Sequence, residues 1–154
     1  MMIHFVRDPR AIYRSYLRLI NPPTKLGRFS LAVKIARFYF RRNMYTLFLK
    51  RKYCKRGLRY IRIRYEDLCD APDQQMHDVF RTCKLEPLTV STAYQNEVNH
   101  IIGGNVNRFK PLGSVRDERK FMFEFSRSLF SFVTLLNLPM ILAFRYPVLK
   151  TTNA

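Results

Sequence analysis

The first 64 residues of this 154-residue chain contain almost no acid. They hold 18 Lys and Arg residues against one carboxylate, Asp8, whereas residues 65–154 hold ten residues of each sign. The whole net charge of +17 therefore arises in the first two-fifths of the chain. Such an asymmetry indicates an anionic partner for that part: a nucleotide phosphate, a sulfated or acidic glycan, a nucleic acid or an anionic lipid.

Cysteine is also scarce. Cys54, Cys69 and Cys83 have no CxxC spacing and no clustered histidines beside them, which argues against a zinc site. One disulfide with one free thiol, or three free thiols, would both suit this number of cysteines.

The chain has no long uninterrupted hydrophobic run. Residues 129–144 are mostly apolar, but Asn137 and Pro139 interrupt them, and 16 residues fall short of the roughly 20 that span a bilayer. We expect a buried helix near the C-terminus and no transmembrane segment. The apolar start runs directly into Arg7, so we expect no secretory signal in these residues.

Hydrophobic residues make up 47% of the chain, enough for one domain with a modest core. Residues 2–6 are short and apolar, and we predict a buried strand there. Asp8 as N-cap and Pro9 as first helical residue predict a helix to about Ile20, where Asn-Pro-Pro follows.

The following segments predict more helices and a second strand. Residues 30–56 have the pattern of a long basic amphipathic helix, with Leu31, Ile35, Phe38, Tyr45 and Leu49 near one face. Residues 59–64 alternate as in a strand, and a helix is expected over 72–83. Further helices are expected around 91–96 and from residue 117 or 118 onward. Two strands joined by helices indicate part of a parallel α/β sheet.

The sharpest functional signal lies at the start of the first helix. Arg7, Ala11 and Ser15 recur at steps of four residues, so a guanidinium, a small side chain and a hydroxyl would share one side. Together with the helix N-terminus they would suit a phosphate. The alternative is that Asp8 and Pro9 merely start a helix whose arginines (Arg7, Arg10, Arg14 and Arg18) form a solvated basic stripe.

Three motifs, in order, resemble those of sulfotransferases that use PAPS (3′-phosphoadenosine 5′-phosphosulfate). His-Phe-Val-Arg-Asp-Pro-Arg-Ala over residues 4–11, with Ser15, is similar to the 3′-phosphate-binding segment of the Golgi Gal/GalNAc/GlcNAc 6-O-sulfotransferases. Ile-Arg-Tyr-Glu-Asp-Leu over 63–68 resembles that family's next landmark, and Gly-Asn-Val-Asn-Arg-Phe over 104–109 resembles its late loop. The resemblance covers about residues 3–109; beyond it, only residues 145–147 match, weakly.

The resemblance implies a fold and a set of site residues. The fold would be α/β, a partial P-loop-like parallel sheet flanked by helices, without the N-terminal phosphate-loop strand. Residues 1–112 would form the C-terminal part of a sulfotransferase domain, and residues 113–154 a terminal helical segment packing on it. Arg7 and Ser15 would hold the 3′-phosphate of PAPS or its product PAP, Tyr65 would lie near the adenine, and Arg108 would be a second phosphate ligand. Structural roles remain open for Tyr65, as a core aromatic, and for Arg108, within a glycine-rich loop.

The family also has features that this sequence lacks. The loop that binds the 5′-phosphosulfate, with its activating basic residue, is absent, so we expect this chain alone to be inactive although the family reaction is sulfuryl transfer to a carbohydrate hydroxyl. The implied partners are the nucleotide donor and a carbohydrate or glycosaminoglycan acceptor, with no nucleic acid, and the implied location is the Golgi. The alternative function is a non-catalytic basic module that binds an acidic glycan, an anionic membrane or RNA.

Overall fold

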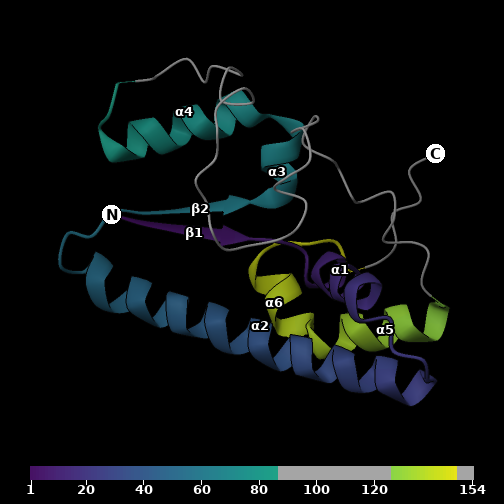
Figure 1. Ribbon diagram of the computed structural model, residues 1–154. Helices are drawn as coiled ribbons and strands as arrows, with labels where there is room; N and C mark the ends of the chain where they lie inside the picture. Colours follow the sequence, from purple (N-terminus) through teal and green to yellow (C-terminus); the bar gives the residue numbers. More distant parts are fainter. Residues whose placement is uncertain (87–125, 149–154) are drawn as a thin grey trace, which may run out of the picture.

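The computed structural model describes residues 1–86 and 126–148. In these ranges a two-stranded parallel sheet lies between helices (Figure 1). The strands are β1 (Met2–Val6) and β2 (Tyr60–Arg64). The helices are α1 (Pro9–Ile20), α2 (Lys25–Cys54), α3 (Tyr65–Asp70), α4 (Pro72–Cys83), α5 (Arg127–Leu136) and α6 (Leu138–Ala143). The fold is therefore mixed α/β and mostly helical. The sequence predicted both strands and their parallel arrangement, and the structure confirms both.

Helix α1 begins and ends where its local sequence indicates. The Asp8 carboxylate accepts from the Arg10 backbone N–H, and Pro9 occupies the first helical position. At the other end, Asn21 adopts a left-handed conformation (φ 42°) and its N–H donates to the Leu17 carbonyl. The predicted bounds of this helix are confirmed.

Helix α2 begins five residues before its predicted start. Thr24 is the N-cap, and its hydroxyl accepts from the Gly27 N–H at 3.0 Å. A Cβ atom at Gly27 would lie 3.0 Å from that hydroxyl and 3.1 Å from Pro22 Cβ, so the first turn favours a glycine. The helix ends at Cys54, and Gly57 follows with φ 86°.

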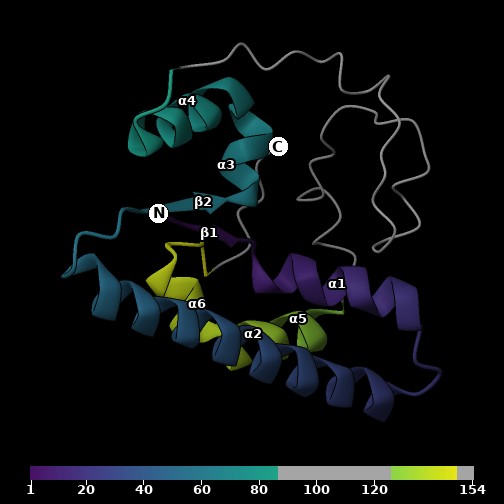
Figure 2. The same ribbon diagram turned by 60° about the vertical axis from the view of Figure 1, so that its left-hand side comes forward.

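The sheet is buried less evenly than predicted. Register pairs run from Met2 with Tyr60 to Val6 with Arg64, and side chains alternate between the two faces. His4 and Val6 are buried against α2 and α6, whereas Ile3 and Phe5 on the other face are 47% and 52% exposed. The expectation of a strand buried throughout is therefore wrong for β1. Both views place α2 and α6 on one side of the sheet and α3 and α4 on the other (Figures 1 and 2).

Small residues set the packing of α2. Ala32 and Ala36 are buried on its inner side, where α1 and α5 approach it. One apolar cluster joins Tyr13, Ala32 and Ile35 to α5, and another joins Val6 and Tyr39 to α6 and the segment after it. The predicted apolar face was wrong in part, because Phe38 and Tyr45 are exposed. Apolar residues surround most of this helix, so spacing alone does not select the buried side.

The apolar stretch near the C-terminus forms two helices instead of one. Asn137 separates α5 from α6, and its buried side chain donates to the Val133 carbonyl at 2.8 Å. Both helices pack against the core, while the expected boundary at residues 112 and 113 lies outside the described ranges. Within those ranges, no helix has the length and apolar character needed to cross a membrane. All three cysteines are free thiols.

Candidate anion-binding site

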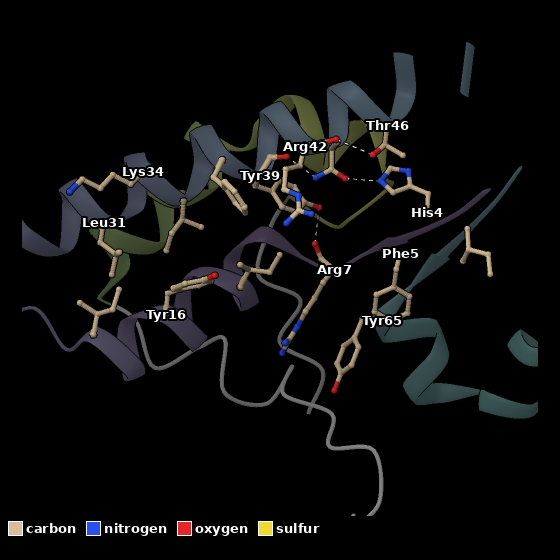
Figure 3. Close-up of a pocket in the computed structure, with 16 residues that line it drawn as sticks. His4, Phe5, Arg7, Tyr16, Leu31, Lys34, Tyr39, Arg42, Thr46 and Tyr65 are labelled. Atoms are coloured by element: carbon tan, nitrogen blue, oxygen red, sulfur yellow. Dashed lines mark hydrogen bonds between the residues drawn. The ribbon is translucent and has the colours of Figure 1, made fainter. Parts of the chain in front are cut away.

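Arg7 and Tyr65 meet where the two parallel strands end. Their neighbours Val6 and Arg64 are register partners, so the next residue of each strand emerges at the same edge of the sheet. The Arg7 guanidinium carbon lies 4.5 Å from the centre of the Tyr65 ring, and the two side chains extend side by side (Figure 3). This cation–π contact orients a half-buried guanidinium at the carboxyl ends of the strands, where open α/β sheets bind ligands.

Two buried side chains fix the peptide group between Arg7 and Asp8. The Tyr39 hydroxyl donates to the Arg7 carbonyl at 2.8 Å, and the Asp8 N–H donates to Glu66 Oε1 at 2.9 Å. Tyr39 comes from α2 and Glu66 from α3, so three elements meet at this one peptide. Both hydrogen-bonding groups of the peptide are satisfied, which sets the direction in which the Arg7 side chain leaves the backbone.

Glu66 and Tyr146 link the same peptide to the segment after α6. The Tyr146 hydroxyl donates to Glu66 Oε2 at 3.0 Å, and both residues are buried. Burial raises the pKa of Tyr39 and of Tyr146 above the usual range for a phenol, and the Glu66 carboxylate raises both further. Both phenols therefore stay protonated and remain hydrogen-bond donors. Glu66 therefore ties helix α3 both to the peptide after β1 and to the segment after α6.

Arg10 is a structural residue and not part of a solvated stripe. It is 2% exposed and binds Asp8 through two nitrogens, Nε to Oδ1 at 2.9 Å and Nη2 to Oδ2 at 2.6 Å. Its Nη2 also donates to the Pro147 carbonyl at 2.8 Å, and its Nη1 to the Val148 carbonyl at 3.3 Å. Arg14 is buried as well, at 5% exposure, so the stripe interpretation is wrong for these two arginines.

The N-terminus of α1 offers fewer donors than the sequence suggested. Pro9 has no N–H, and the Asp8 carboxylate accepts the Arg10 N–H. Ala11, the small side chain expected on the same side as Arg7 and Ser15, is 5% exposed and packs inside. An anion at this edge would therefore be held chiefly by side chains.

A groove of about 850 Å³ runs from Arg7 and Tyr65 along α1 and α2. We call it the α1–α2 groove; its walls are largely apolar, and Arg7, Lys34 and Arg42 bring positive charge to it (Figure 3). Its volume is in the range of small-molecule sites. An anion with a flat or apolar body would match this combination of cations and apolar surface.

The structure unites two of the four predicted site residues. Arg7 and Tyr65 both line the α1–α2 groove. Ser15 is exposed in the second turn of α1 and does not line the groove, although its neighbour Tyr16 does. Arg108 lies outside the described residues. Sequence reasoning did not identify Tyr39, which lies 32 residues from the carbonyl that it binds.

His4 forms a second buried network beside the groove. The Asn43 side chain donates through Nδ2 to the Tyr39 carbonyl, so its Oδ1 faces His4 and accepts from Nε2 at 2.8 Å. The other ring nitrogen, Nδ1, then accepts from the Tyr60 hydroxyl at 2.8 Å. Burial lowers the pKa of His4, and the neighbouring cations Arg62 and Lys50 lower it further, which favours this neutral form.

Comparisons of this chain with protein-family models, with curated proteins and with solved structures gave no match. The assignment of function therefore depends on the geometry of the site and on the motifs in the sequence.

Proposed function

We propose that this chain carries the 3′-phosphate-binding part of a PAPS site in a carbohydrate sulfotransferase. In the family reaction the sulfuryl group leaves the 5′-phosphate oxygen of PAPS and forms a bond to a sugar hydroxyl oxygen, which loses its proton, and PAP departs. The strand pair would be the late part of a P-loop-like sheet, and the location would be the Golgi.

The observation that carries the proposal is the Arg7–Tyr65 pair. A guanidinium offers two parallel N–H donors to phosphate oxygens, and the ring beneath it restricts its orientation. The fixed peptide after Arg7 lowers the entropy that ligand binding would cost. Tyr65 would also offer an aromatic edge to the adenine, while Ser15 and Arg108 are proposed as further phosphate contacts.

Nucleotide binding tests this proposal. We expect PAP to bind the purified chain in isothermal titration calorimetry, and adenosine 5′-phosphate to bind much more weakly because it has no 3′-phosphate. Arg7→Ala should weaken PAP binding by about 10- to 100-fold, the range for a hydrogen-bonded charge. Arg7→Lys should recover only part of this loss, because an ammonium lacks the planar pair of donors.

Arg37→Ala is the matched control, since it removes the same charge from the exposed side of α2. If both alanine variants weaken PAP binding equally, the interaction is a general effect of charge and the proposed site is wrong. Ser15→Ala should cost a few-fold, as expected for one neutral hydrogen bond.

A further inference from the structure

The outer side of α2 has an unusual surface. We call it the outer face of α2 and define it by exposed side chains on the side of the helix away from the buried Ala32, Ala36 and Tyr39: Leu26, Val33, Arg37, Phe40, Arg41, Met44, Tyr45, Phe48, Arg51 and Lys52. In both views this helix forms an outer border of the molecule (Figures 1 and 2). Among the described elements, α2 packs chiefly on α1 and α5. Each side chain of the outer face is exposed.

Large apolar side chains on the outer face are exposed to an unusual degree. Leu26 is 80% exposed, Tyr45 64% and Phe48 59%, while Phe40 and Met44 exceed 40%. A helix face that meets only water is normally polar. Large exposed apolar side chains bordered by polar groups are typical of interaction sites.

Charge restricts the partner. The 30 residues of α2 include nine Lys and Arg residues and no acid. Arg37 and Arg41 lie among the apolar side chains of the outer face, and together they border a shallow hollow in it. A partner must therefore supply negative charge and also accept aliphatic and aromatic side chains.

An anionic membrane surface meets both requirements. A helix of 30 residues is about 45 Å long and presents its outer face in one plane, which suits a flat surface. Aromatic and aliphatic side chains enter the boundary between headgroups and acyl chains, and cations pair with lipid phosphates. RNA fits less well, because bases stack on aromatic rings but not on Leu26, Val33 or Met44, and its deep groove excludes side chains.

We propose that α2 docks along its length on an anionic phospholipid membrane through this outer face. This docking uses none of the residues assigned to the nucleotide, and it holds whether or not the chain binds PAP. Arg7 and Tyr65 meet at the ends of the strands, and neither belongs to the outer face of α2.

Vesicle sedimentation tests the docking. The purified chain should bind phosphatidylcholine vesicles that contain phosphatidylserine, bind pure phosphatidylcholine weakly, and dissociate as salt is raised. Arg37→Gln with Arg41→Gln should weaken binding by about 25-fold, at about fivefold per cation. Met44→Gln with Phe48→Gln, which keeps every charge, should also weaken it. Arg59→Gln with Arg81→Gln is the control, because it removes two cations on the α4 side.

Equal binding by the control and the Arg37/Arg41 variant would overturn the proposal. So would retention on single-stranded RNA without retention on vesicles. Because the chain has no tryptophan, Phe48→Trp provides a unique reporter. Its emission should shift to the blue with anionic vesicles, whereas that of Leu85→Trp, on the α4 side, should not. An unshifted Phe48→Trp emission with the protein bound to vesicles would also contradict docking through α2.

Discussion

The tips of the two strands and the outer face of α2 contain the same kinds of side chain in opposite environments. At the strand tips, Arg10, Tyr39 and Tyr146 are buried, and each has a specific hydrogen-bond partner. On the outer face, Arg37 and Tyr45 are exposed. Arginine therefore serves here as an internal cross-link in one region and as available charge in the other, so a count of cations overstates the charge that a ligand can reach.

The largest expected effect on this contrast comes from removing one arginine from each region and measuring the free energy of unfolding. Arg10→Met should lower the free energy of unfolding by about 3–5 kcal/mol, because it leaves Asp8 buried without its counter-charge. Arg41→Met should change it by no more than about 0.5 kcal/mol, as exposed substitutions do. Urea titrations followed by circular dichroism measure both.

The double variant Asp8→Asn with Arg10→Met separates loss of the pair from loss of packing. Asparagine keeps the N-cap and removes the unpaired charge, so the double variant should be more stable than Arg10→Met alone. Equal stability of Arg10→Met and Arg41→Met would show that burial does not distinguish the two regions.

The strand and helix limits near the site follow from short-range signals, whereas the cross-links around it do not. Asp8, Pro9 and Asn21 act on their own turns, so the sequence predicted α1 correctly. The Arg10 partners, the carbonyls of Pro147 and Val148, lie 137 and 138 residues away, beyond any local pattern. A buried arginine and a solvated one look alike in such a sequence.

The same reasoning explains why the sequence predicted only some of the residues at the candidate site. Arg7 and Tyr65 each follow directly after a strand, and parallel strands bring their ends together, so the pairing was predictable. Helix α3, which begins at Tyr65, was not predicted, because its six residues are too few to show a period. The spacing of apolar residues did not identify the inner side of α2. It therefore did not identify Tyr39 as a buried residue.

An effect of intermediate size is expected when one tyrosine hydroxyl is removed from the inner or the outer side of α2. Tyr39→Phe should cost about 1–3 kcal/mol of stability, because the Arg7 carbonyl loses its buried donor. It should also weaken PAP binding, since the peptide that directs Arg7 is then held on one side only. Tyr45→Phe removes an exposed hydroxyl and should alter neither quantity. Loss of stability with unchanged PAP affinity would show that Tyr39 supports the fold without positioning Arg7.

The smallest expected effect concerns the buried His4, whose contribution to stability depends on pH. The pKa of His4 is lowered in the folded protein, so the unfolded chain takes up its proton first as the pH falls below about 6.5. The stability that depends on the neutral His4 ring is therefore complete above about pH 6.5. It is lost as the pH falls from about 6.5 through the lowered pKa of the folded protein, with a slope of at most about 1.4 kcal/mol per pH unit. The difference in unfolding free energy between the wild type and His4→Gln should shrink over this interval. A flat difference for His4→Gln would mean that the ring exchanges its proton as freely in the folded protein as in the unfolded chain, and the hydrogen bonds with Asn43 and Tyr60 would not constrain it.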